Sequence, residues 1–488
     1  MANIYIYDIT FLVLFTIAVV IFLYKKRKNL KKDGWMYLYP TKIGIKFIDY
    51  VGGKYKKTLT VLSYVSVISG YILMSSMVFM LYTLLKLYLF EPKLVQALKI
   101  PPILPLIPYV PEIFKLNFLP PFYFTYWIIA IAVIAICHEF SHGIFARRYG
   151  VKIKSTGFGF LGPLLAAFVE PDEKQMEKIP KFQQITILSA GTFANVILTF
   201  LFFLLLVGFS AVAYHPAGVM FDSYAAASVN VNAITMVDGV KVMNQTSNGL
   251  LEIINKNNIK DNLIVGSDKD SANLTTMDVN GTKFLIPMDI LKADLEKNPE
   301  AVDMYYDLPA IRVRLTGVIV KVDNYKIQTR SDILTAFSNY KPGDNITIIT
   351  KTDTGEVVNK ITLAEDPLNK GRPLVGIAYA PTSGTLLAKI FNAFNLFRQP
   401  GTAYEAVWNP DLMLFIYNLL LWLILINFSV ALVNMWPVAI FDGGRTFMLT
   451  VWAITKSENF AKIAFKVVTY LILGAVILMM YGWVVAVF

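Results

Sequence analysis

The chain has 488 residues, of which 56% are apolar and only 16% are charged. An ordinary soluble domain carries about 25% charged residues, so this composition excludes a typical cytosolic enzyme, and the apolar surplus also excludes a disordered chain. A single cysteine, Cys137, excludes intrachain disulfides and a zinc site built from several thiolates. The net charge of +11 fits either a nucleic-acid binder or a membrane protein with basic cytoplasmic loops. The apolar content favours the membrane protein.

Six apolar runs approach or exceed the roughly 20 residues that cross a bilayer. The first run ends in the basic cluster 25–28, so its charge follows the apolar stretch, and we expect an uncleaved anchor rather than a signal peptide. A further apolar segment, 156–169, is rich in glycine and too short for a confident helix. The six predicted spans are 9–24, 59–90, 122–146, 185–213, 412–433 and 463–488.

Basic residues gather in three loops that fall on one side of the membrane if the spans alternate. Residues 25–57 contain eleven Lys or Arg, and smaller groups follow the third span and lie around the start of the last one. The positive-inside rule places these loops in the cytoplasm and residues 214–411 outside. We therefore expect a multi-pass protein of the cell membrane with an extracytoplasmic insertion.

The insertion is polar, strand-like and contains a weak internal repeat. In each copy a strand turns, at Asp238-Gly239 or at Asp323-Asn324, into a second strand and a short helix. This order resembles PDZ domains, more clearly in the second copy, and such folds bind a peptide as an added strand at a sheet edge. The alternative is an inert extracytoplasmic insert.

His138, Glu139 and His142 form the pattern H-E-x-x-H within the third predicted span. Positions i and i+4 share one face of a helix, so both imidazoles can bind one Zn²⁺, and Glu139 can reach a water on the metal. These polar groups are costly inside the hydrocarbon region unless they are paired or bind a metal. The alternative is a polar patch between helices or a degenerate site.

A catalytic zinc has three protein ligands and one open position, so a third ligand is needed. His215 lies past the end of its span and is a poor candidate, whereas Glu170 and Asp172 follow the glycine-rich segment. Asp442 follows the fifth span, where Pro437 breaks the helix. An unwound segment at membrane depth must be covered by protein or water. We favour Asp442, and the alternative is an aspartate that only caps the turn.

At these residues the chain resembles the site-2 protease family of intramembrane zinc metalloproteases. The shared features are H-E-x-x-H followed by glycine, the pattern N-x-x-P-x-x-x-F-D-G-G at 434–444, and G-x-x-x-N at 191–195. Thr192 replaces the family's usual proline, and Phe441 replaces its usual leucine. Residues 157–171 resemble the family's membrane-embedded hairpin, and PDZ-like modules between the metal-bearing spans are also a family feature. The Ile-, Lys- and Asn-rich composition favours an archaeal source.

The resemblance implies a polytopic α-helical membrane protein with about six transmembrane helices, a membrane-embedded hairpin and an inserted extracytoplasmic α+β PDZ-like region. It implies zinc-dependent hydrolysis of a peptide bond within or near the transmembrane segment of a membrane-protein substrate. Glu139 would act as the general base beside Zn²⁺. Asn195 and Asn434 would lie near the oxyanion or the unwound substrate, although either could instead join helix to helix. The partners are then the substrate, lipid and a peptide ligand of the PDZ-like region, with no nucleic acid.

Four segments follow from this interpretation: 1–119 with two spans and a basic loop, 120–213 and 386–488 as the two parts of the catalytic membrane core, and 214–385 as a tandem PDZ-like region. We also expect the hairpin to hold an unwound substrate strand by edge pairing, with Phe158 and Phe160 on the pairing edge.

Three other functions are compatible with parts of this pattern. A catalytically inactive membrane scaffold would bind peptides through its PDZ-like region and would not depend on Glu139. An ion or metal transporter would distribute polar groups along a path, often in two related halves, which this sequence lacks. A tethered protease of soluble substrates would place H-E-x-x-H outside a span.

Overall fold

The computed structural model describes residues 2–34, 36–114, 116, 119–161, 164–266, 271–379 and 401–487. The chain divides into two compact units, which we call the membrane unit (residues 1–209 and 411–488) and the inserted unit (residues 210–410). The expected segment boundary at residues 385 and 386 lies outside the described residues, as do Gly162 and Pro163 of the expected hairpin.

Six described helices are long and apolar enough to cross a membrane, which confirms the predicted number and makes the chain a multi-pass membrane protein. A helix satisfies all of its backbone hydrogen bonds internally, which lipid requires of a spanning segment. The six are α1 (Ala2–Lys26), α3 (Lys56–Phe90), α6 (Phe124–Arg148), α8 (Lys181–Ala213), α14 (Pro410–Asn434) and α16 (Glu458–Val487). The shorter helices of the membrane unit are α2 (Ile45–Lys54), α4 (Pro92–Leu98), α5 (Val110–Ile113), α7 (Glu173–Lys178) and α15 (Asp442–Thr455), with a 3₁₀ turn at Arg27–Asn29.

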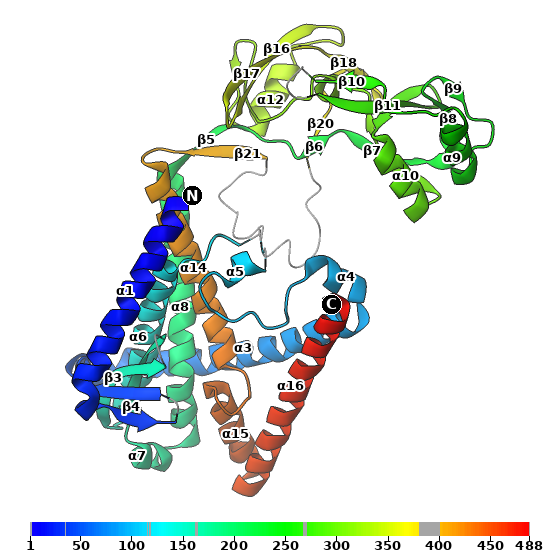
Figure 1. Ribbon diagram of the computed structural model, residues 1–488. Coiled ribbons are helices and arrows are strands. Elements are labelled where there is room, and N and C mark those ends of the chain that lie inside the picture. Colours follow the sequence, from blue (N-terminus) through cyan, green and yellow to red (C-terminus); the bar gives the residue numbers. More distant parts are fainter. Residues whose placement is uncertain are drawn as a thin grey trace. The chain divides into compact units, whose positions relative to one another are not determined.

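Helix α6 packs between α1 and α14 in the membrane unit (Figure 1). The ring centroids of Tyr126 on α6 and Phe415 on α14 lie 5.1 Å apart in this contact. Asp8 of α1 is 5% exposed and accepts hydrogen bonds from the backbone N–H groups of Phe124 (2.7 Å) and Thr125 (2.9 Å). These are free donors at the positive end of α6, so a side chain from another helix caps it and fixes its start.

A four-stranded antiparallel sheet lies beside α6, in the order β1-β2-β3-β4. Its strands are β1 (Lys31–Asp33), β2 (Met36–Thr41), β3 (Ile153–Leu161) and β4 (Leu164–Pro171). The expected hairpin corresponds to β3 and β4. Strands β1 and β2 lie in the segment that the sequence analysis treated only as a basic loop, because their short run contains charged residues and Pro40.

The expectation that Phe158 and Phe160 lie on a free pairing edge is wrong. Strand β2 pairs with β3 along its length and sets Tyr39 opposite Phe158 and Tyr37 opposite Phe160. Pro40 lies opposite Gly157, in the position next to the pair of Tyr39 and Phe158. Hydrogen-bonded and non-hydrogen-bonded pairs alternate along an antiparallel ladder, so proline, which has no N–H, fits at this position. The edge strands of the described sheet are therefore β1 and β4, and β4, which pairs only with β3, is the edge strand of the hairpin.

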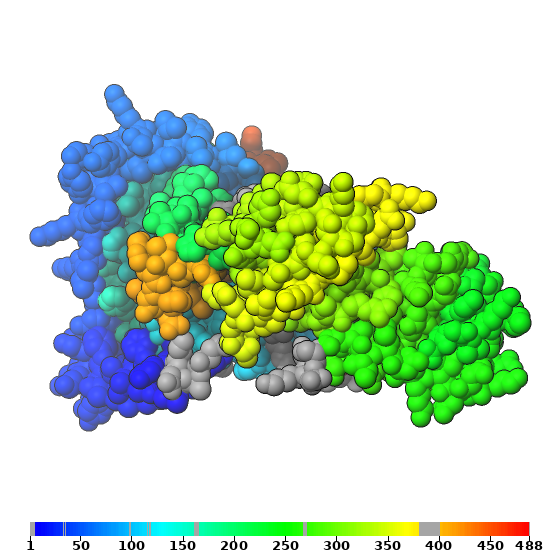
Figure 2. Space-filling view, turned by 90° about the horizontal axis from the view of Figure 1, so that it is seen from above, coloured from blue at the N-terminus to red at the C-terminus, as the bar shows by residue number. Residues whose placement is uncertain are grey.

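The inserted unit is built mainly of antiparallel strands in two lobes, drawn in green and in yellow-green to yellow (Figure 2). Its larger described sheets have the orders β7-β13-β12-β11-β8-β9, with β10 on β11, and β17-β16-β14-β5-β21, with β15 on β14. Two further strand pairs are β18-β19 and β6-β20.

Both copies of the expected repeat have the predicted local order of strand, turn, strand and helix: β8, β9 and α9 in the first lobe, and β14, β15 and α12 in the second. The strands of the unit are β5 (Tyr214–Val219), β6 (Ser223–Tyr224), β7 (Ala226–Asn230), β8 (Ile234–Val237), β9 (Val240–Lys241), β10 (Leu263–Val265), β11 (Ala272–Val279), β12 (Thr282–Ile286), β13 (Ala301–Tyr306), β14 (Val318–Val322), β15 (Tyr325–Lys326), β16 (Asn345–Thr352), β17 (Gly355–Thr362), β18 (Ala364–Asp366), β19 (Asn369–Leu374), β20 (Ile377–Ala378) and β21 (Thr402–Ala406). Its helices are α9 (Ser247–Lys256), α10 (Met288–Lys297), α11 (Pro309–Arg312) and α12 (Arg330–Phe337), with a 3₁₀ turn at Val231–Ala233.

Candidate metal centre

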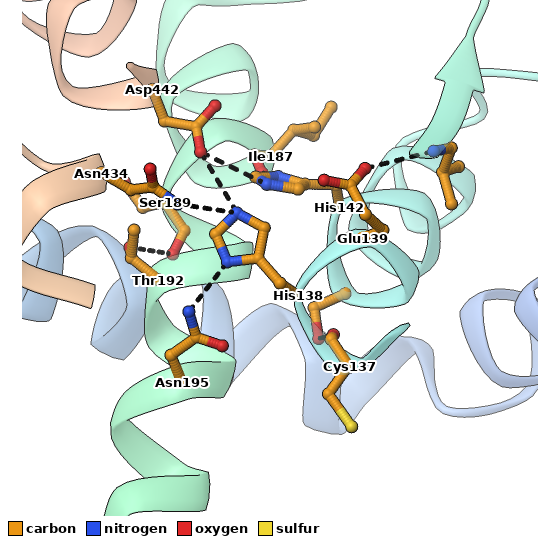
Figure 3. A network of polar contacts seen from close by, with 12 residues as sticks. Cys137, His138, Glu139, His142, Ile187, Ser189, Thr192, Asn195, Asn434 and Asp442 are labelled. Atoms are coloured by element: carbon orange, nitrogen blue, oxygen red, sulfur yellow. Dashed lines mark hydrogen bonds and ion pairs between the residues drawn. The ribbon is translucent and has the colours of Figure 1, made fainter. Parts of the chain in front are cut away.

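Two histidines and one aspartate meet inside the membrane unit (Figure 3). His138 and His142 lie one turn apart on α6, and their Nε2 atoms are 3.5 and 3.4 Å from Oδ2 of Asp442. One ligand atom from each residue lies within 4.8 Å of the other two. The side chains are only partly accessible, at 8% for His138, 14% for His142 and 25% for Asp442.

Asp442 reaches the histidines because the chain breaks between α14 and α15. Helix α14 ends at Asn434, before Pro437, as the sequence predicts, and the structure adds a helix, α15, that begins at Asp442. The two glycines that follow allow a close approach of backbone to backbone. A Cβ on Gly443 would lie 2.3 Å from the carbonyl of Met435, and one on Gly444 would lie 2.2 Å from the carbonyl oxygen of Val438. Only glycine at both positions lets α15 begin at this place.

Helix α8 lies behind the two imidazoles and contacts both of them. The carbonyl oxygen of Ile187 is 2.6 Å from Nδ1 of His142, and Nδ2 of Asn195 is 3.0 Å from Nδ1 of His138. Gly191 lies between these contacts, and a Cβ there would stand 2.3 Å from Nε2 of His142 and 2.6 Å from Nε2 of His138. The glycine therefore keeps open the space in which the ligand atoms meet.

The donor set fits a catalytic zinc ion. Two imidazole nitrogens and one carboxylate oxygen are a known ligand combination for such sites, and three ligands leave a fourth position for water or substrate. Gly191 lets the backbone of α8 pack directly against both imidazoles, because any larger residue would place a Cβ against their Nε2 atoms.

Glu139 lies beside the cluster but does not join it. Its Oε2 accepts a hydrogen bond of 3.1 Å from the backbone N–H of Val169 on β4. A pocket of about 330 Å³ is lined by Glu139 together with all three members of the cluster. Asn434 also lines this pocket, and its Nδ2 lies 3.4 Å from Nε2 of His138.

The other acidic and imidazole candidates have different environments. Glu170 accepts a hydrogen bond from the hydroxyl of Ser155, and Asp172 caps α7 by accepting the N–H of Gln175 at 3.3 Å. His215 lies in β5 of the inserted unit, where Nδ1 contacts a neighbouring carbonyl.

Three groups at this site were not predicted from the sequence: the N–H of Val169, the carbonyl of Ile187, and Arg445, which lines the pocket. Arg445 follows Asp442 by three residues on α15 and so shares its helix face. That spacing was a usable signal. The backbone groups of Val169 and Ile187 could not be predicted in this way, because every residue other than proline has the same backbone N–H and C=O.

The fold and the cluster define a multi-pass membrane protein with an H-E-x-x-H-type metal site. Residues 126–475 match peptidase family M50, and the chain belongs to this family, the site-2 protease family of zinc-dependent metalloendopeptidases. It is also similar to an uncharacterized protein of Methanocaldococcus jannaschii, with 35% identity over 199 residues. That match covers 38% of this chain and 48% of the relative, so the chain spans about half of the relative's length.

Proposed function

We propose that the chain is an intramembrane protease that cleaves membrane-protein substrates within or near their transmembrane segments. The observation that carries this proposal is the cluster of His138, His142 and Asp442 on and beside an apolar helix of spanning length. His138 lies about 13 Å from the basic end of α6, given a rise of 1.5 Å per residue, so the site lies at membrane depth. A substrate bond at that depth belongs to a membrane segment.

The chemistry divides between the metal and the side chains around it. Bound by His138, His142 and Asp442, Zn²⁺ would lower the pKa of a water molecule and polarise the scissile carbonyl. Glu139 takes the proton of the attacking water on its carboxylate and returns it to the leaving amine. The N–H of Val169 holds that carboxylate in place. Asn434 lines the same pocket, and its proposed role is to donate from Nδ2 to the substrate carbonyl oxygen.

We propose that strand β4 holds the unwound substrate. The N–H of Val169 points away from β3 toward Glu139, and alternate residues of a strand point the same way. Ala167 and Leu165 therefore direct their N–H and C=O groups to the open edge of β4. A substrate strand added there would run past Glu139 and satisfy backbone groups that a helix satisfies by itself.

We propose that the basic loops face the cytoplasm. Residues 25–57, after α1 and around α2, contain most of the Lys and Arg residues found between positions 1 and 120. Short loops with this excess are retained on the cytoplasmic side. The inserted unit then lies outside the cytoplasm.

A second activity, peptide binding, is supported by a groove in the second lobe of the inserted unit, whose strand and helix order is PDZ-like. The groove has a volume of about 430 Å³ and runs between α12 and residues 372–379. Ile333, Leu334 and Phe337 of α12 supply its apolar wall. Arg330 and Arg372 are the charged residues among its described lining.

This combination favours an extended peptide that ends in an apolar residue and a free carboxylate. The apolar wall covers the last side chain, and the arginines attract the terminal charge. A fluorescent peptide with a free carboxylate should bind more tightly than the same peptide with a terminal amide. Arg372→Gln should reduce that preference. Equal binding of the two peptides would contradict the proposed ligand, without touching the protease proposal.

The protease proposal is tested by incubating the purified protein with a single-span model substrate in lipid nanodiscs. Mass spectrometry of the products should place the cut within or near the span, and Glu139→Gln should slow that cut by about 10²- to 10⁴-fold. Cleavage only in a soluble tail would support the tethered protease. Peptide binding without any cleavage would support the inactive scaffold.

A further inference from the structure

Three residues of α8, spaced four positions apart, form a stripe behind the imidazoles: Ile187, Gly191 and Asn195. Figure 3 shows Ile187 beside His142 and Asn195 beside His138. The first contact of the stripe fixes a proton. A carbonyl oxygen can only accept, so Nδ1 of His142 must donate to Ile187 across their 2.6 Å contact. Nε2 of His142 then keeps its lone pair, and this nitrogen faces Asp442.

The same requirement applies to His138. Its Nε2 also faces Asp442, so a metal bound there needs the lone pair of Nε2 and a proton on Nδ1. A protonated Nδ1 needs an acceptor. The group at this position is the carboxamide of Asn195, 3.0 Å away through Nδ2. An NH₂ group facing an N–H group would place two donors against each other.

The other end of the same carboxamide supplies the acceptor. Asn195 is fully buried, and its Oδ1 has no hydrogen-bond partner among the residues that the structure describes. A half turn of the amide exchanges Oδ1 and Nδ2 without moving the rest of the side chain. It brings the unpartnered oxygen against the Nδ1 proton of His138, and both groups gain a partner.

We propose that Asn195 is a positioning residue for the metal ligand His138, which it holds in the tautomer with the proton on Nδ1 by accepting that proton on Oδ1. The inference rests on the proposed zinc protease function. It separates the two asparagines that the sequence analysis grouped together. Asn195 is buried behind His138 and does not line the pocket, whereas Asn434 lines the pocket and contacts Nε2, the nitrogen that the metal takes.

The test measures zinc affinity by chelator competition on the full-length protein. Asn195→Ala should weaken zinc binding by about 10- to 100-fold, the usual effect of losing such a supporting contact. Asn195→Asp, which can accept but not donate, should stay close to wild type. Thr192→Val is the matched control, because Thr192 is buried on the same helix but donates only to Ser189 within it. Equal losses in the Ala and Asp variants would overturn the inference.

A second measurement does not depend on whether the variants fold. The chain has only three histidines, so ¹⁵N-imidazole NMR of the zinc-loaded wild type gives few signals. Protonated Nδ1 and metal-bound Nε2 should appear for both His138 and His142. An unprotonated Nδ1 on His138 in the zinc-loaded protein would overturn the inference. Absence of zinc from the wild type would instead overturn the proposed function on which it rests.

Discussion

The carboxylate of Glu139 accepts a hydrogen bond from the backbone N–H of Val169 at 3.1 Å, and this bond joins α6 to the open edge of β4. Gly143, one turn further along α6, gives Val169 room, because a Cβ there would stand 3.1 Å from Cγ1 of Val169 and the side chains would have to shift slightly. Glu139, the proposed base, and β4, the strand proposed to pair with the substrate, therefore hold each other in position. A substrate paired with β4 would arrive beside the residue that handles its protons.

Replacing the carboxylate of Glu139 separates proton transfer from metal binding. Glu139→Gln should lower kcat by about 10²- to 10⁴-fold, because an amide cannot take the proton of water. Zinc content should not change, since Glu139 lies outside the ligand cluster. The control is Glu170→Gln, whose carboxylate accepts a hydrogen bond from Ser155 instead. A Glu139→Gln variant that cleaves at the wild-type rate would remove Glu139 from the mechanism.

A methyl group on α8 should close the metal site. Gly191→Ala would place a Cβ 2.3 Å from Nε2 of His142, so the imidazoles or the helix must shift. We expect zinc to be lost when the variant is washed with a chelator, as measured by atomic emission. Gly208→Ala on the same helix is the control, because its Cβ meets no described atom within 4 Å. If the two variants hold equal zinc, the close packing of Gly191 against the imidazoles is not needed for metal binding.

The open edge of β4 can be tested at one backbone group. Ala167→Pro removes an N–H that points away from β3, so the sheet stays paired while a substrate strand loses one hydrogen bond. A loss of this size lowers kcat/KM by about 3- to 10-fold. Ala167→Val keeps the N–H and serves as the control. If Ala167→Pro cleaves like Ala167→Val, the substrate does not pair with β4.

Acid should loosen the second lobe of the inserted unit at Asp366. Its carboxylate accepts hydrogen bonds from the side chain of Asn369 and the N–H of Leu368, with Arg372 nearby, and these hold its pKa below the ordinary 3.8. Because the folded pKa is the lower one, the stabilisation is complete above pH 3.8 and is lost as the pH falls through the folded value.

Hydrogen exchange of β18 and β19, corrected for the intrinsic effect of pH, measures this loss. Protection should fall between about pH 5 and pH 2 in the wild type and change less in Asp366→Asn. If protection falls equally with pH in the wild type and in Asp366→Asn, the loss of protection comes from titratable groups other than Asp366.

The six spans were predictable because bilayer thickness fixes the length of an apolar run. In lipid, a single segment can satisfy all of its backbone hydrogen bonds only as a helix. The meeting of His138, His142 and Asp442 was predictable because the chain has few imidazoles and because Pro437 and the following glycines mark a break beside Asp442. The exact ends of the spans were not, since polar residues extend α3 and α8 by several residues beyond the apolar runs.

The sheet shows where sequence reasoning fails. Nothing in the run at 36–41 signals a strand that pairs with a partner more than a hundred residues away, so β2 was missed and Phe158 was placed on a free edge. Asn195 shows a different limit. The motif marks the residue, but only the geometry shows that it lies behind His138 and not in the pocket.

The most direct test of the account is the zinc content of the purified wild type beside Asp442→Ala, with cleavage of a single-span substrate measured in the same samples. Asp172→Ala is the control, because this carboxylate was also a candidate ligand from the sequence but caps α7. We predict one zinc per chain in the wild type and in the control, and loss of both zinc and cleavage in Asp442→Ala. A wild type that cleaves without zinc, or an Asp442→Ala variant that keeps both zinc and cleavage, would contradict it.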